Sequence, residues 1–145
     1  VGSGILLSQD VDIYEGETAA ETVVRMLQNN GYSVDYTGNY ETGFYLARIS
    51  SESNFVTGNI PEDLRTKLEE HGFEIYDFTP NSLGDYDFTK GSGWMYQVNG
   101  VYPNYGLSDY CFQNGDTLRL RFTLAYGADI GQDMTGGSDN WGDEW

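Results

Sequence analysis

The sequence predicts an α+β protein in which a mixed sheet packs on one main helix, with a short second helix inserted. Two patterns carry this prediction. Apolar residues early in the chain recur with helical spacing, whereas those of the C-terminal third alternate with polar residues as they do in strands. The 145 residues are the usual size of one domain. A chain of this length buries roughly 70% of its unfolded surface, so its core requires no disulfide or metal.

The clearest element is a helix that begins at Thr18 and ends near Asn30. Thr18 and Glu21 have the spacing of a capping box, in which side chains at the helix start bind free backbone N–H groups. Gly31 can adopt the left-handed conformation that commonly follows a helix. Four apolar residues at i, i+3, i+4 and i+7 form one face: Ala20, Val23, Val24 and Leu27.

A second helix is expected from Pro61 to His71, because proline suits the first turn and the acidic residues after it favour the positive end. The Asn99-Gly100 pair predicts a type I′ hairpin turn, and Asn114-Gly115-Asp116 predicts another tight turn. A polar loop is expected over 81–90. Short apolar or alternating stretches predict strands at 5–7, 11–14, 32–36, 44–49, 73–78, 94–98 and 117–124.

The charge of the chain limits its partners. Seven basic residues against 23 acidic ones give a formal charge of −16, which repels nucleic acid and anionic membranes. The apolar runs are only a few residues long, so neither a transmembrane helix nor a signal peptide is expected. Such a charge can select cations, or it can simply keep the protein soluble, which is the simpler explanation.

Candidate catalytic residues are few. His71 is the only histidine, and it lies near a helix end, where the helix dipole favours a cation without any further function. Cys111, the only cysteine, lies in an aromatic, strand-like stretch of the kind that often holds a small buried cysteine. No local residue offers it a base. The sequence therefore predicts no enzyme, no catalytic residue and no required cofactor.

The C-terminal residues 132–145 form an acidic tail in which Trp141 and Trp145 are expected to act as anchors. Its carboxylates offer the oxygen ligands that Ca²⁺ prefers, but their spacing matches no EF-hand loop. A solvated acidic surface explains them more simply, and no metal site is predicted. The residues in question are Asp133, Asp139, Asp143 and Glu144.

The most distinctive segment runs from Gly93 to Gly106, where aromatic and amide side chains alternate through the hairpin and the loop after it. Tyr and Trp combine a rigid face with a polar tip, as recognition surfaces do. Alternation alone would also place Trp94 and Tyr96 on the inner face of a sheet, so core packing is the alternative for these two. Pro103 stiffens the loop and reduces the entropy lost on binding. The predicted ligand-binding residues are Tyr96, Gln97, Tyr102, Asn104, Tyr105 and Tyr110.

The block from Gly91 to Gly106, with Asn114–Asp116 and Tyr126–Gly131 after it and Gly4–Leu7 and Tyr14–Thr18 before it, resembles the bacterial transcobalamin-like C-terminal domain family. That family is found in surface proteins of Gram-positive bacteria. The resemblance implies a β-grasp-like fold, export to the extracellular space or cell wall, and distant kinship to the domain that closes over cobalamin in animal carriers.

On this resemblance, residues 1–131 form the domain, with an insertion at about 61–84, and 132–145 form the tail. The expected function is a non-enzymatic extracellular or wall-associated module that binds a soluble ligand, with a corrinoid as the named candidate. The alternative is an adhesion or spacer domain whose partner is a protein, a second copy of itself included.

Overall fold

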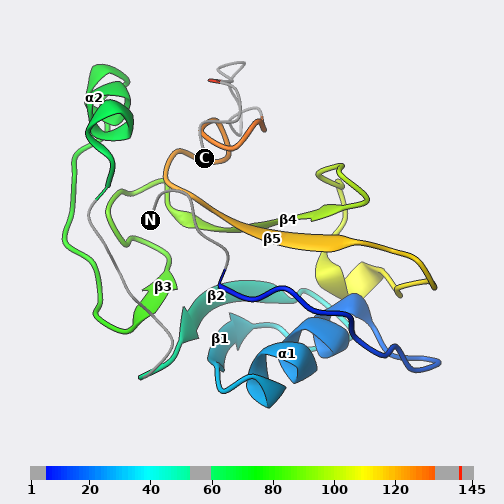
Figure 1. Ribbon diagram of the computed structural model, residues 1–145. Coiled ribbons are helices and arrows are strands. Elements are labelled where there is room, and N and C mark those ends of the chain that lie inside the picture. Colours follow the sequence, from blue (N-terminus) through cyan, green and yellow to red (C-terminus); the bar gives the residue numbers. More distant parts are fainter. Residues whose placement is uncertain (1–5, 53–59, 133–140, 142–145) are drawn as a thin grey trace.

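The computed structural model describes residues 6–52, 60–132 and 141 (Figure 1). Its elements confirm the predicted α+β class, with a main helix early in the chain and a shorter one in the middle. In chain order they are α1 (Ala19–Asn29), β1 (Ser33–Thr37), β2 (Tyr45–Ser50), α2 (Glu62–Glu70), β3 (Ser82–Gly84), β4 (Gly93–Val98), the 3₁₀ turn η1 (Leu107–Asp109) and β5 (Leu118–Thr123).

The described strands form two antiparallel sheets where the sequence predicted one mixed sheet. The first has the order β1-β2-β3, and the second pairs β4 with β5. A single isolated bridge, between Gly91 and Ala125, is parallel. The two sheets lie one above the other in Figure 1, with α1 below the first. Aromatic side chains of β2 and β4, those of Tyr45, Trp94 and Tyr96, line a space between these two strands.

Helix α1 follows the prediction closely. The Thr18 hydroxyl oxygen accepts a hydrogen bond from the Glu21 N–H at 3.3 Å, and Gly31 has a φ of +83°. The helix buries a continuous face in the core, and each fully buried Val or Leu contributes roughly 1.5–3 kcal/mol. The buried residues are Ala19, Ala20, Thr22, Val23, Val24 and Leu27.

Three predicted strands, at 5–7, 11–14 and 73–78, are wrong for the residues that the structure describes. Residues 6–14 have no regular structure, and Leu6 and Tyr14 are exposed because no neighbouring strand covers them; position 5 lies outside the described residues. Residues 73–78 also lack a strand. Their alternation buries Phe73, but the backbone pairs with the Phe88 segment through only the Tyr76 N–H and the Asp77 carbonyl.

The predicted loop at 81–90 contains β3, because Leu83 is buried and its backbone pairs with Ile49 of β2. The Asn99-Gly100 turn is confirmed, with φ values of +53° and +82° as type I′ requires. Its hairpin is one pair long: Val98 and Val101 exchange backbone hydrogen bonds. The chain then leaves β4, and β5 becomes the partner strand.

Two further expectations concern the C-terminal half. Cys111 was expected to be buried in a strand, but it is exposed in a segment without regular structure, so that prediction is wrong. Trp141 packs on the described fold as an anchor: its ring centroid lies 4.4 Å from that of His71 and 6.2 Å from that of Phe73. Trp145 and the four candidate calcium ligands lie outside the described residues.

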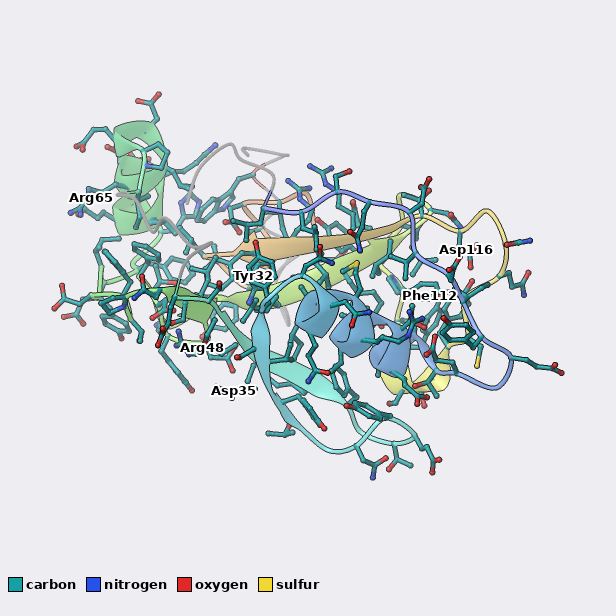
Figure 2. The ribbon with its side chains drawn as sticks, turned by 60° about the horizontal axis from the view of Figure 1, so that its bottom comes forward. Tyr32, Asp35, Arg48, Arg65, Phe112 and Asp116 are labelled. Carbon is teal, nitrogen blue, oxygen red and sulfur yellow. The ribbon has the colours of Figure 1, made fainter. Side chains whose placement is uncertain are left out.

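The buried carboxylate of Asp87 joins the first sheet to the segment that precedes β3. Asp87 forms an ion pair with Arg48 of β2 at 2.6 Å and accepts hydrogen bonds from the backbone N–H groups of Gly84 and Thr79. Its side chain is only 4% exposed. Figure 2 places Arg48 nearer the end of the molecule that carries Arg65 than the end that carries Asp116.

Replacing Asp87 by Asn should therefore lower the free energy of unfolding by about 3 kcal/mol, because the Arg48 charge loses its buried partner. Urea denaturation followed by circular dichroism measures this loss. Asp77→Asn, at an exposed carboxylate, is the matched control and should stay within about 0.5 kcal/mol of the wild type. Equal destabilisation by the two variants would contradict the role of Asp87.

Candidate functional site: a pocket between the two sheets

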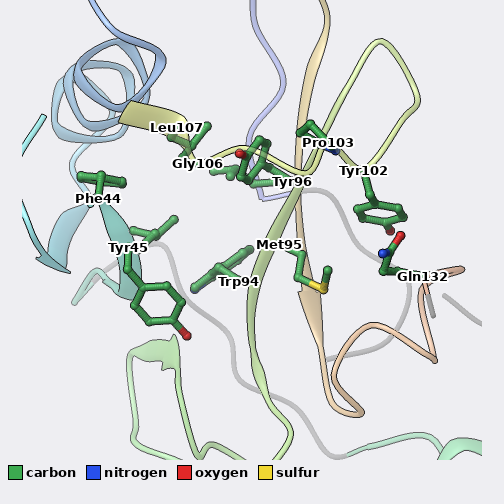
Figure 3. A pocket seen from close by; sticks show the side chains of 12 residues that line it. Phe44, Tyr45, Trp94, Met95, Tyr96, Tyr102, Pro103, Gly106, Leu107 and Gln132 are labelled. Carbon is green, nitrogen blue, oxygen red and sulfur yellow. The ribbon is translucent and has the colours of Figure 1, made fainter. Parts of the chain in front are cut away.

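A pocket of about 250 Å³ opens between the two sheets (Figure 3). Phe44, Tyr45 and Leu46 line it from the first sheet, and β4 contributes Trp94, Met95 and Tyr96. The described residues that line this pocket include no charged side chain. The remaining lining residues are Tyr102, Pro103, Gly106, Leu107, Leu120 and Gln132.

Strand alternation sets the position of Trp94. In β4, Trp94 pairs with Phe122 of β5, and their ring centroids lie 5.3 Å apart with the planes at 63°. Its indole N–H donates a hydrogen bond of 2.8 Å to the Leu83 carbonyl of β3. Trp94 therefore fixes the second sheet to the first while one part of its ring faces the pocket.

Tyr45 stands at the mouth of the pocket. Its side chain is 46% exposed, and its hydroxyl donates a 2.8 Å hydrogen bond to the Asp85 carboxylate. Burial of the phenol, followed by the hydrogen bond to Asp85 and its charge, raises the pKa of Tyr45 well above its usual range. A Cβ at Gly93 would lie 3.1 Å from the Asp85 carboxylate. The tyrosine and the carboxylate thus lie together against the start of β4.

Tyr96 is fixed at the other end of the pocket. Its hydroxyl donates a hydrogen bond to the Tyr105 carbonyl, which joins β4 to the loop that follows it. Burial raises the pKa of Tyr96 to about 12, with Tyr105 and the Asp109 carboxylate adding to the effect. Asp109 lies in η1 and accepts a hydrogen bond from the Gly106 N–H. A second carboxylate therefore lies beside Gly106, which lines this end of the pocket.

Of the six predicted binding residues, Tyr96 and Tyr102 line the pocket. The Tyr102 hydroxyl donates to the Ile130 carbonyl at 2.6 Å and accepts from Arg121 at 3.2 Å. This phenol therefore attaches its loop to the segment after β5, so its removal would affect the fold as well as the pocket. Gln97 is half-buried in β4 and Asn104 is exposed in the loop.

Tyr105 and Tyr110 form a separate cluster, with stacked rings whose centroids are 5.3 Å apart. The Tyr110 hydroxyl donates to Asp116 at 2.5 Å, and Asp116 also accepts from the Gln113 N–H and the Asn99 amide. Figure 2 places Asp116 and Phe112 together at the end of the molecule opposite Arg65. Two of the six predicted residues therefore line the pocket and two lie in this cluster, whereas Gln97 and Asn104 do not line the pocket.

Phe44 and Tyr45 are two aromatic pocket residues that sequence reasoning missed. They belong to a predicted strand far upstream of the aromatic block, and strand alternation does not say which strands become neighbours. His71 and Cys111, for which the sequence predicts no catalytic role, are not among the residues that line the pocket. His71 has its Nδ1 2.8 Å from the Lys67 carbonyl oxygen, at the end of α2.

The fold and the site define an α+β domain with a neutral aromatic pocket between two antiparallel sheets. Residues 71–123 match the model of a family described as a domain of unknown function, DUF4430. This match includes the Gly91–Gly106 block and the strands β3, β4 and β5. Comparison with curated proteins and with solved structures found no match to the chain.

Within 6–52, 60–132 and 141, no three His, Cys, Asp or Glu residues gather in a way that could hold a metal ion. None of the helices there has the length and apolar character needed to cross a membrane.

Acid should weaken the hydrogen bonds that the Asp116 carboxylate accepts from Gln113, Tyr110 and Asn99. The Gln113 N–H first, and then Tyr110 and Asn99, lower the pKa of Asp116 by hydrogen bonding to its ionised form. Because the pKa is lowered in the folded protein, this stabilisation is fully present when the pH is above the ordinary aspartate pKa of about 4. It is lost as the pH falls through the lower pKa that Asp116 has in the folded protein. An NMR titration of the Gln113 amide should show its inflection below about pH 4.

Asp116→Asn provides the control for this titration. It should remove the acid inflection, and it should also lower the pKa of Tyr110 from about 12 towards its ordinary value near 10. A Tyr110 pKa that does not change in the variant would contradict the hydrogen bond.

Proposed function

We propose that this protein is a non-enzymatic binding module that takes part of a soluble ligand into the pocket between its two sheets. The main support for this proposal is the pocket itself. Ligand sites are typically concave and mostly apolar, with a few placed polar groups that give orientation. Here Phe44 and Trp94 supply apolar walls, and the Tyr45 hydroxyl, fixed by Asp85, supplies a polar group at the mouth.

The size of the pocket limits what can enter. A volume of about 250 Å³ corresponds to roughly eight water molecules and lies just below the range of sites that enclose a drug-sized ligand. A macrocycle is too large for this space and can present only an edge or a side group. The proposed ligand is therefore either small or bound edge-on.

The resemblance of Gly91–Gly106 to transcobalamin-like domains supports two further parts of the proposal. It favours a location outside the cell or in the cell wall of a Gram-positive bacterium, and it names a corrinoid as a candidate ligand. The match to DUF4430 covers the same block. A corrinoid would meet the pocket edge-on, between Tyr45 and Tyr96.

The non-enzymatic part of the proposal is supported by the chemistry of the pocket. The Tyr96 hydroxyl is engaged with a backbone carbonyl, the Tyr45 hydroxyl with Asp85 and the Tyr102 hydroxyl with Ile130. The candidate base and nucleophile, His71 and Cys111, are not among the lining residues.

An adhesion or spacer role is the second candidate, and one surface feature favours it. The rings of Tyr36, Tyr40 and Phe44 form a group at the β1–β2 end of the first sheet, with centroid separations of 5.0–6.4 Å. Tyr36 is 38% exposed. If this group mediated self-association, Tyr36→Ser would abolish a dimer seen by sedimentation, whereas a monomeric wild-type protein would exclude that role for this surface.

Tyr45→Ala should weaken ligand binding by about tenfold or more, the ~1.4 kcal/mol scale of one lost contact. Cobinamide and cobalamin are the probes, titrated with visible absorbance as the readout. Tyr14→Ala, which removes a tyrosine that is 58% exposed and does not line the pocket, is the control. Binding that is equally strong in both variants would place the ligand elsewhere.

A further inference from the structure

We propose that the group recognised in this pocket is a small alkylated ammonium cation, because aromatic faces from two sheets meet there between two carboxylates. The inference rests on the proposed function, since it names the chemistry of the ligand group that enters the same pocket. Three observations carry it: the arrangement of the rings, the charges at the two ends of the pocket, and the positions of the nearby arginines.

The rings come from both sides of the space. Figure 3 shows Phe44 and Tyr45 on one side and Trp94 and Tyr96 on the other. A cation within about 6 Å of a ring centroid is attracted by the electron-rich face, and pockets of several aromatic rings recognise quaternary ammonium groups. The methyl groups of such a cation would pack on Leu107 and Leu120, which line the same pocket.

Negative charge is present at both ends of the pocket. At the mouth, the Asp85 carboxylate accepts the hydrogen bond of Tyr45. At the other end, the Asp109 carboxylate accepts a hydrogen bond of 3.3 Å from the N–H of Gly106, which lines the pocket. A carboxylate that accepts a phenol hydrogen bond draws positive charge towards the hydroxyl and leaves the ring more electron-rich. Asp85 therefore strengthens the attraction of the Tyr45 ring for a cation, and Asp109 adds negative charge at the opposite end.

Arg48 of β2 and Arg121 of β5 are engaged with other groups. Arg48 pairs with Asp87 at 2.6 Å and donates to the Asp85 carbonyl. Arg121 donates to the Tyr102 hydroxyl and the Ile130 carbonyl. Neither is among the described lining residues, so no protein cation opposes a ligand cation there. A phosphate or carboxylate ligand would instead meet two like charges, and the formal charge of −16 would add to this repulsion.

An uncharged apolar ligand is the competing occupant, and a pair of isosteric probes separates the two. Choline carries a trimethylammonium group, and 3,3-dimethyl-1-butanol has the same shape without the charge. Calorimetric titration of the full chain should give saturable choline binding and at least tenfold weaker binding of the neutral analogue. The NMR signal of the Trp94 indole N–H, which is fixed on Leu83, should shift with choline.

Two conservative variants test the contribution of charge without disturbing the fold. Asp85→Asn keeps an oxygen that can accept the Tyr45 hydrogen bond but removes the carboxylate charge, so choline binding should weaken severalfold while the neutral analogue is unaffected. Asp77→Asn removes an exposed carboxylate that lies outside this pocket, and it should leave choline binding unchanged. A similar loss in both variants would mean that the effect comes from net charge, and it would overturn the assignment to Asp85.

The outcomes also separate this inference from the proposed function. If the neutral analogue binds as tightly as choline, the cation inference is overturned and the pocket remains a ligand site. If neither probe binds but a corrinoid shifts the Trp94 signal, the inference alone is overturned. If choline, its analogue and both corrinoids all leave the Trp94 signal unchanged, the proposed function fails as well.

Discussion

The structure depends on Trp94, because this side chain joins two sheets that remain separate in the described part of the chain. Its indole N–H reaches the Leu83 carbonyl of the first sheet, and its ring packs on Phe122 of the second. A bond to a buried carbonyl avoids the cost of an unsatisfied polar group. This bond ties β4 to β3, while residues of β2 and β4 face each other across a small space. The space between them is the pocket.

The many acidic residues have different roles once they are folded. Asp87 holds Arg48 and two backbone N–H groups, and the fully buried Asp129 accepts from the Thr123 hydroxyl and the Leu124 N–H. These carboxylates fix the ends of strands. Their hydrogen bonds within the protein take the place of the hydrogen bonds to water that they lose on burial. Asp85 differs, since it lies at the pocket mouth and binds a half-exposed tyrosine. Net charge alone does not distinguish these roles.

Sequence patterns predicted the elements whose causes are local. The Thr18 cap and the apolar face of α1 lie within one helix, and the φ values of Asn99 and Gly100 are preferences of a single turn. The strand predicted at 73–78 failed because alternation indicates a buried face but does not supply a partner strand. The site was predicted only in part, because alternation likewise does not indicate which strands become neighbours. Tyr96 and Tyr102 stood out in the aromatic block, whereas Tyr45 joins them only through the packing of the two sheets.

A crystal structure grown with saturating choline would test the central claim most directly, that the space left by Trp94 between the sheets is a site for a cation. The trimethylammonium group is expected to lie between Tyr45, Trp94 and Tyr96, within about 6 Å of their ring centroids. Choline bound only to carboxylates on the outer surface, with the pocket holding none, would contradict it.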